Sequence, residues 1–122
     1  MTRINAGFPV KKLTDKHLLA EHREIKRIPN TIKSGKAKFE NIPQNFTLGA
    51  GHVKFFYDKL GYLKERYLEI HRECILRGFN VTNYTECWDG LPEKLMKNWT
   101  PSDFDSQLIV NRINERLSEM KK

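Results

Sequence analysis

Hydrophobic residues recur every three or four positions in three stretches of the chain, which is the spacing of a helix that buries one face. The first stretch runs from Asp15 to about Ile28, the second from Val53 to Gly78, and the third follows Thr100. The second stretch is the best candidate for the central helix of the core. The pattern therefore predicts three main helices joined by irregular segments.

Residues at the ends of the first two stretches favour particular helix starts and stops. Thr14 and Asp15 can accept hydrogen bonds from the first free amides of a helix, so the first helix should begin there. Pro29 lacks a backbone donor and its ring clashes with the carbonyl four residues back, which predicts a kink or an early end near Ile28. Gly78 suits the C-cap of the second helix.

The third helix has start signals of its own. Thr100 is the predicted cap, Pro101 suits the first turn, and Asp103 complements the positive end of the helix dipole. Arg112 and Arg116 lie four positions apart and should project together from one edge of this helix. The predicted buried face consists of Phe104, Leu108, Ile109, Ile113 and Leu117.

Three segments carry Gly, Pro and polar residues without a sustained period, and we expect them to be irregular. Residues 1–13 should run as an extended arm, residues 34–51 as a basic loop and turns, and residues 80–98 as a long connection with two buried anchors, Trp88 and, just past it, Trp99. The aromatic residues 55–57 have two interpretations, stacking on nucleic-acid bases or packing in the core. Their spacing favours packing.

The bulk properties restrict the class of protein. A chain of 122 residues is long enough for one hydrophobic core, so we expect a single domain over residues 1–122. The hydrophobic content of 39% is ordinary for a globular protein, and no apolar stretch reaches the length of a membrane span. The amino terminus lacks the apolar run of a secretory signal, so we expect a soluble, cytoplasmic protein.

The chain is strongly basic, with 22 Lys and Arg against 15 Asp and Glu, a formal charge of +7 and an isoelectric point of about 9.5. This balance favours a polyanionic partner, and nucleic acid is the first choice, although anionic membrane surfaces also attract basic proteins. Cys74 and Cys87 form no CxxC pair, and the four histidines lack the spacing of zinc ligands. We therefore expect reduced cysteines and neither a metal nor a cofactor.

A charged edge on the first predicted helix is a candidate for function. Arg23 and Arg27 lie four positions apart, which makes them neighbours on a helix surface, and Glu24 is displaced from Arg23 by about 100°. Two cations and one carboxylate would then border the same cleft. The alternative is a solvated helix face in which Glu24 pairs with Arg27 and carries no chemistry.

Six blocks of sequence carry a resemblance to a known enzyme family. They are MTRIN at 1–5, DKHLLAEHRE at 15–24 followed by Arg27, LGAGHVKFFYDKL at 48–60, EC at 73–74, RGFN at 77–80 and RINER at 112–116. In this order and at nearly this spacing, they resemble the phage-type pyrimidine-dimer DNA glycosylase and abasic-site lyase, historically called endonuclease V. The resemblance covers nearly the whole chain. It implies a compact all-α fold of three main helices, with the amino-terminal arm threaded between the first two.

The resemblance also implies a mechanism. Once Met1 is removed, the α-amine of Thr2 attacks C1′ of the damaged nucleotide, displaces the base and holds the sugar as an imine, after which β-elimination breaks the strand. A terminal amine has a reference pKa of about 7.7–8.0, so a neutral fraction exists at physiological pH. Glu24 matches the essential acidic residue, which stabilises charge and moves protons. The arginines that match phosphate-gripping positions are Arg3, Arg23, Arg27, Arg112 and Arg116.

The implied partner is double-stranded DNA that contains damaged pyrimidines or abasic sites, bound by a monomer. The family bends this duplex and flips a base out of the stack. The sequence departs from the family at two places. The best-known members end in an aromatic tail that helps engage the dimer, whereas this sequence ends in Met120, Lys121 and Lys122, and His22 replaces an aromatic residue.

Three alternatives to a dimer glycosylase therefore stay open. The first is an abasic-site lyase or an oxidised-pyrimidine glycosylase without dimer specificity. The second is a non-catalytic basic DNA-binding module, which predicts salt-sensitive DNA binding without strand cleavage. The third is a helical interaction protein whose charges serve solvation alone. The presence of Thr2 together with Glu24 argues against the second and third, since neither needs an amine and a carboxylate in those places.

Overall fold

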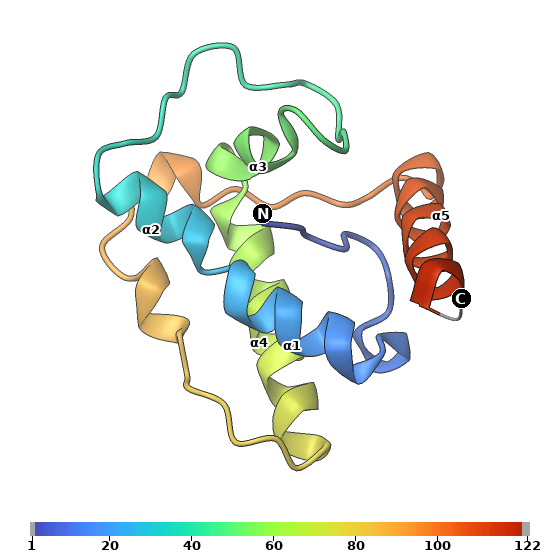
Figure 1. Cartoon of the computed structure of the whole chain (residues 1–122). Coiled ribbons are helices and arrows are strands. Elements are labelled where there is room, and N and C mark those ends of the chain that lie inside the picture. The colour runs from blue at the N-terminus through green and yellow to red at the C-terminus, as the bar shows by residue number, and fades with distance from the viewer. Residues whose placement is uncertain (1, 121–122) are drawn as a thin grey trace.

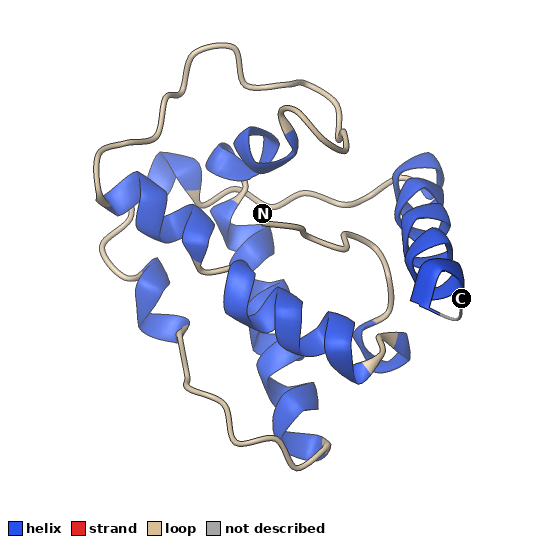
Figure 2. Ribbon diagram, viewed as in Figure 1, coloured by secondary structure: helices blue, strands red, loops and turns tan. Residues whose placement is uncertain are grey.

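The computed structural model describes residues 2–120, the last three by their backbone alone, and its regular structure is helical (Figure 1, Figure 2). The predicted removal of Met1 concerns a residue outside this range. The helices are α1 (Asp15–Glu24), α2 (Arg27–Lys33), α3 (His52–Phe55), α4 (Leu60–Leu76) and α5 (Asp103–Met120), with short 3-10 turns η1 (Val10–Lys12), η2 (Phe56–Asp58), η3 (Thr85–Trp88) and η4 (Glu93–Leu95). Over residues 2–120 there is no strand, only an isolated bridge between Lys59 and Met96. The all-α class predicted from the sequence is confirmed.

The first predicted helix is divided in two beside Pro29. α1 starts as predicted after Thr14, whose hydroxyl accepts a hydrogen bond from an amide of the first turn. It ends at Glu24, and α2 resumes at Arg27, so Pro29 lies in the first turn of a new helix. The missing N–H costs little there, because the first amides of a helix have no partner within it. The predicted early end is confirmed, but it falls before Ile28.

The second predicted helix is interrupted near its start. Lys59 separates α3 and η2 from α4, and its φ of −124° and ψ of 38° are not helical. The same residue forms the isolated bridge with Met96, which brings the long connection back against α4. The end of the helix is as predicted. Gly78 has a φ of +84°, and two amides beyond the last turn donate to its carbonyls in a Schellman motif.

The cap of α5 is Ser102, whereas the sequence predicted Thr100. Ser102 Oγ accepts from the N–H of Asp105, and the Asp105 carboxylate accepts from the N–H of Ser102, both at 3.1 Å. This reciprocal pair satisfies two amides at once. Ile113 is buried as predicted, but Phe104 is 72% exposed. Nine positions at 100° each place Phe104 on the side of the helix opposite to Ile113, so the two cannot share one buried face.

The hydrophobic core forms where α1 packs on α4. Phe55 and Phe56 are fully buried, which confirms packing over base stacking for these two rings, and Trp88 is buried as predicted. Other fully buried side chains come from the arm and from several helices: Ile4, Leu18, Ile25, Ile28, Leu60, Leu63, Tyr67, Ile70 and Ile109. The arm and α5 are therefore anchored in the same core as the central helices.

The amino-terminal arm lies between the α1 and α4 pair and α5, where Figure 1 shows it as a dark blue trace. Residues 4–6 are buried. Gly7 has a φ of +77°, and a Cβ there would overlap Ser106 Oγ and lie 3.2 Å from Pro101 Cβ. Glycine is thus required where the arm passes Ser106 of α5. The threading of the arm between the first two helices stays a prediction in that detail.

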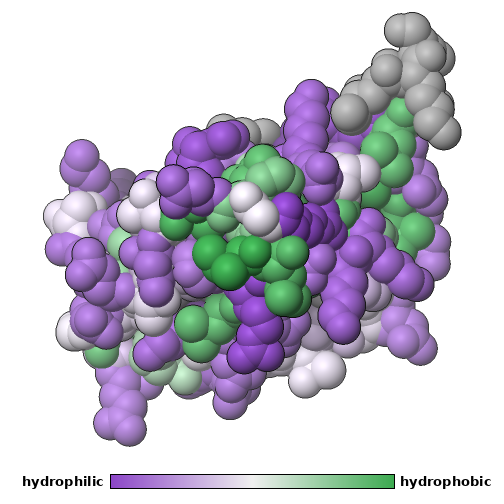
Figure 3. Space-filling view, turned by 90° about the horizontal axis from the view of Figure 1, so that it is seen from below, coloured by the Kyte–Doolittle hydropathy of each residue, from purple (hydrophilic) through white to green (hydrophobic). Residues whose placement is uncertain are grey.

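The face seen from below is mostly hydrophilic in Figure 3, which also shows a cluster of hydrophobic side chains on it. Leu68, Ile75 and Leu76 of α4 are among the exposed apolar side chains. Within residues 2–120, the helices lack the combination of length and apolar composition that crossing a bilayer requires.

A buried histidine makes the stability of this fold depend on pH. His22 of α1 is 3% exposed, and its Nε2 lies 3.1 Å from the hydroxyl of Tyr67 and 3.1 Å from Nδ1 of His71. Burial, the His71 imidazole and Lys26 together lower the pKa of His22 from 6.5 to about 4. The unfolded chain therefore takes up this proton at a higher pH than the folded chain does.

We expect the neutral His22 to make its full contribution to the free energy of unfolding above pH 6.5. This contribution should be lost as the pH falls toward about 4, which lowers the free energy of unfolding by at most ~3 kcal/mol. Urea denaturation at a series of pH values measures this change. His22→Phe, which keeps a ring against Tyr67, should remove this part of the acid dependence. An identical pH dependence in the variant and the parent protein would contradict the assignment.

Candidate active site

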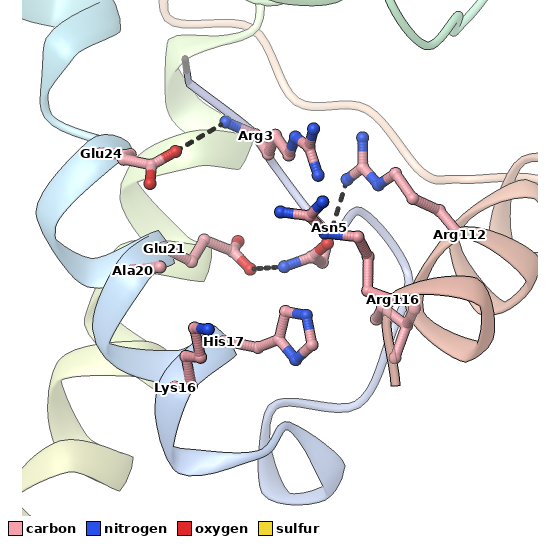
Figure 4. Close-up of a pocket in the computed structure, with 10 residues that line it drawn as sticks. Arg3, Asn5, Lys16, His17, Ala20, Glu21, Glu24, Arg112 and Arg116 are labelled. Carbon is pink, nitrogen blue, oxygen red and sulfur yellow. Dashed lines mark hydrogen bonds between the residues drawn. The ribbon is translucent and has the colours of Figure 1, made fainter. Parts of the chain in front are cut away.

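A pocket of about 450 Å³ opens between α1, the amino-terminal arm and α5. Figure 4 shows carboxylates of α1 on one side, guanidinium groups of α5 on the other, and the arm between them. The pocket is lined by Arg3, Asn5, Lys16, His17, Ala20, Glu21, Glu24, Arg112, Ile113 and Arg116. Three segments that are distant in the sequence thus supply cations and carboxylates to one space.

Glu21 is the buried carboxylate of the pocket. Its Oε1 accepts from Asn5 Nδ2 at 2.8 Å and from Arg66 Nη2 at 3.0 Å, and its Oε2 accepts from Arg66 Nε. Burial acts to lower the pKa of the Arg66 guanidinium, but the charge and hydrogen bonds of Glu21 outweigh it and raise the pKa above its ordinary value. Because both oxygens are occupied, Glu21 joins the arm to α1 and α4 and is poorly placed to bind a substrate.

Glu24 is the more accessible of the two carboxylates that line the pocket. Its side chain is 15% exposed and lines the pocket. Oε1 accepts from the backbone N–H of Arg3 at 3.2 Å, and Oε2 lies 3.8 Å from Nη2 of Arg23. The Arg23 side chain is 62% exposed, so solvent screens this ion pair and it contributes little energy. Oε2 therefore keeps the capacity to accept another donor.

The hydrogen bond from Arg3 to Glu24 also fixes where Thr2 lies. Three covalent bonds separate the nitrogen of Arg3 from the nitrogen of Thr2, so the two atoms are within about 4 Å of each other. Thr2 itself is half-buried. The structure thus brings two of the predicted residues, Thr2 and Glu24, near each other, although Thr2 itself is not among the residues that line the pocket.

Three of the five predicted arginines line the pocket: Arg3, Arg112 and Arg116. Arg112 Nη2 donates to Asn5 Oδ1 at 3.0 Å and to the carbonyl of Ile4 at 3.4 Å. Burial, and after it the charges of Arg3 and Arg116, lower the pKa of Arg112 to about 10, so this side chain is still a cation at neutral pH. Cations held this close to one another favour an anion between them.

The other two predicted arginines lie outside this lining. Arg23 is on the exposed side of α1, and Arg27 is exposed on α2. The single continuous helix that the sequence predicts through Arg23 and Arg27 is divided, because α1 ends at Glu24 and α2 begins at Arg27. Arg23 still approaches Glu24 from the rim, at the 3.8 Å given above.

The family model described as pyrimidine dimer DNA glycosylase matches residues 1–86 of the chain. This protein belongs to the pyrimidine dimer DNA glycosylase family. The match spans the arm and helices α1 to α4, and therefore includes Thr2, Arg3 and Glu24. The family resemblance seen in the sequence blocks is confirmed. The protein is accordingly a DNA repair glycosylase whose substrate is DNA.

In this glycosylase, α5 lies beyond the matched region, yet it closes one side of the pocket. Its contribution is cationic, through Arg112 and Arg116. The residues of the pocket that lie within the matched region, 1–86, supply the carboxylates and the amino-terminal arm. The two parts meet at Asn5, which donates to Glu21 and accepts from Arg112.

Sequence analysis missed several residues of the glycosylase pocket, among them Asn5, Lys16, His17 and Glu21. The hydroxyl of Thr14, which caps α1, accepts a hydrogen bond from the backbone N–H of His17 and lies 2.8 Å from Nδ1 of the same residue. Burial and the nearby arginine and lysine charges lower the pKa of His17. A signal was available, because His17, Glu21 and Glu24 are spaced four and three apart and so share one helix face.

Proposed function

We propose that this glycosylase is bifunctional: it excises cyclobutane pyrimidine dimers and then nicks the strand as an abasic-site lyase, using the Thr2 α-amine and Glu24. The observation that carries the proposal is the 3.2 Å hydrogen bond from the N–H of Arg3 to Glu24 Oε1. It supports an arrangement in which a primary amine and a partly exposed carboxylate lie close together beside a cationic pocket. Lyase chemistry through an imine requires such a pair.

The first step breaks the bond between the sugar and the base. The neutral Thr2 amine forms a bond to C1′, the bond from C1′ to the base nitrogen breaks, and the base leaves with the electron pair and takes up a proton. Positive charge develops at C1′ and O4′ during this displacement. Glu24 is the anion that stabilises this charge.

The second step breaks the strand. Opening of the sugar ring puts a proton on O4′ and leaves a protonated imine between C1′ and the Thr2 nitrogen. The imine acidifies the C2′ proton, whose removal sends electrons toward C1′ and expels the 3′ phosphate oxygen from C3′. Glu24 is the base that we assign to these proton transfers. Water then hydrolyses the imine and releases the amine for another cycle.

The arginines bind the DNA around the lesion in this account. Arg3, Arg112 and Arg116 surround the reacting sugar, and Arg23 and Arg27 extend the cationic surface along α1 and α2. Planar guanidinium groups suit phosphate oxygens, and each phosphate contact releases counterions. We further propose that the protein acts as a single-domain monomer on DNA in the cytoplasm, without a metal or cofactor.

Removal of one phosphate-binding arginine should weaken the salt dependence of DNA binding by an amount that corresponds to one lost phosphate contact. For Arg116→Gln, we expect weaker binding and a plot of log affinity against log salt that is less steep by about 1. Fluorescence anisotropy with an undamaged duplex measures the slope. Lys97→Gln, which removes an exposed cation outside the pocket, is the matched control and should leave the slope within error. Equal slopes for both variants would contradict the assigned contact.

Three duplexes of one sequence test the proposed function and its alternatives. They carry a single cyclobutane dimer, a single abasic site, or no damage, and strand nicking is followed on a gel. Nicking of the first two supports the bifunctional enzyme. Nicking of the abasic duplex alone indicates a lyase without dimer specificity. Binding without any nicking indicates a non-catalytic module.

A further inference from the structure

His52 is a buried polar residue that the mechanism above does not use. It opens α3 and is 4% exposed, and its ring meets the edges of two phenylalanine rings, Phe46 and Phe56, with centroids 5.5 Å away in each case. Packing alone would be better served by an apolar ring, because burying an imidazole costs free energy unless its nitrogens are hydrogen-bonded. Both nitrogens of His52 are hydrogen-bonded.

The partners of His52 fix its protonation state. Nε2 lies 2.9 Å from the backbone nitrogen of Ile4, which can only donate, and Nδ1 lies 2.9 Å from the carbonyl of Thr47, which can only accept. The ring is therefore neutral, with its proton on Nδ1 and its lone pair on Nε2 aimed at the arm. An imidazolium would lose the bond to Ile4.

The charges around His52 agree with a neutral ring. Burial is the largest influence and lowers the pKa of this imidazole, and Arg112 of α5 and Arg3 of the arm act in the same direction. The hydrogen bond to Thr47 and the carboxylate of Glu21 in α1 act in the opposite direction, and the net shift is downward. The acceptor on Nε2 is thus present at neutral pH.

Two adjacent amides of the arm are held by side chains from different helices. The N–H of Arg3 donates to Glu24 of α1, and the N–H of Ile4 donates to His52 of α3. Other contacts of the arm, such as the buried side chain of Ile4 and the bond from Asn5 to Glu21, lie on the far side of these amides from Thr2, so the two bonds at neighbouring amides set the position and rotation of the backbone next to Thr2. Thr2 is attached directly to the first of these amides.

We propose that His52 is a positioning residue: as a neutral acceptor it holds the Ile4 amide and thereby sets where the Thr2 amine lies relative to Glu24. The role in catalysis rests on the proposed function, since it concerns the same amine. The contact that holds the arm does not depend on the proposed function, because it is present in the free protein. A misplacement of about 1 Å is enough to slow a positioned reaction by about 100-fold.

Two variants separate positioning from packing. His52→Phe keeps a ring between Phe46 and Phe56 but removes the acceptor, and His52→Gln restores a carbonyl oxygen near the place of Nε2. Ile70→Val, a core truncation in α4 away from the pocket, controls for a general loss of stability. All three are compared with the parent protein by melting temperature, by amide hydrogen exchange, and by single-turnover cleavage of an abasic duplex.

In His52→Phe, we expect exchange at the Ile4 amide to rise at least about tenfold more than exchange at core amides of α4, because a buried donor has lost its partner. Cleavage should slow by about 10-fold to 100-fold, with the affinity for the duplex within about twofold of the parent. His52→Gln should restore most of the protection of the Ile4 amide and most of the cleavage rate, and Ile70→Val should leave both unchanged. In the parent protein, nitrogen NMR of His52 should find Nδ1 protonated and Nε2 unprotonated.

Several results would overturn the proposal. Uniform or unchanged exchange in His52→Phe would mean that His52 does not hold the arm. Selective exchange at Ile4 with an unchanged cleavage rate would mean that the hold has no effect on the amine. If the parent protein itself cleaves nothing, the proposed function fails, while the exchange and NMR comparisons still decide whether His52 holds the arm.

Discussion

Strand cleavage should be lost when the α-amine of Thr2 is no longer the free terminus. In the variant Thr2→Gln, the larger second residue prevents removal of Met1, so position 2 becomes part of a peptide bond. The nearest free amine is then displaced by one residue, about 3.5 Å along the chain. Single-turnover cleavage of a dimer duplex and of an abasic duplex should both fall by at least about 1,000-fold.

The control for this change is Thr2→Ser. Serine is also small, so Met1 is still removed and a free α-amine stays at the same place; mass spectrometry of both proteins verifies their termini. We expect Thr2→Ser to cleave within about tenfold of the parent protein. DNA binding should be similar in all three proteins, because the arginines of the pocket are untouched. Full activity in a Thr2→Gln protein that verifiably keeps Met1 would exclude this amine as the nucleophile.

Replacing Glu24 by glutamine should slow the chemistry while leaving the arm in place. The amide oxygen of glutamine can still accept from the N–H of Arg3, so the 3.2 Å contact and the position of Thr2 are preserved. The negative charge and the proton acceptor are both lost. General acid-base catalysis contributes about 100-fold to 10,000-fold, so we expect Glu24→Gln to cleave the abasic duplex more slowly by a factor in this range.

Glu115→Gln is the matched control, because Glu115 is an exposed carboxylate of α5 that does not line the pocket. It should cleave at the rate of the parent protein. The affinity of Glu24→Gln for the abasic duplex should be unchanged or slightly higher, since one negative charge near the phosphates is gone. A Glu24→Gln protein that cleaves within about threefold of the parent would leave the proton transfers without their assigned residue.

The sequence predicted the helices well where a local signal decides them. Thr14, Pro29 and Gly78 act through their own backbone or through amides within a few residues. Thr14 and Gly78 have the effects expected of them, and the break beside Pro29 is present but falls before Ile28. The start of α5 shows how a local signal misleads. Thr100 and Ser102 are both acceptable caps, and only the pairing of Ser102 with Asp105 chooses between them.

The pocket was harder to predict because long-range contacts build it. Glu21 meets Arg66 across 45 residues, and the Ile4 amide meets His52 across 48 residues. No periodicity links such pairs, so the sequence alone does not distinguish a paired carboxylate from an accessible one. Family resemblance supplied Glu24 as the candidate, and the structure distinguishes it from Glu21, because both oxygens of Glu21 are already hydrogen-bonded.

The most direct test of the account is to trap the imine. The purified protein, with its terminus verified by mass spectrometry, is mixed with a duplex that carries one cyclobutane dimer, and borohydride is added to reduce any imine to a stable amine. We predict a covalent complex of protein and DNA whose cross-link maps to the nitrogen of Thr2. A protein that has lost Met1 and nicks the duplex, but forms no adduct or forms one at a lysine, would contradict the central role of this amine.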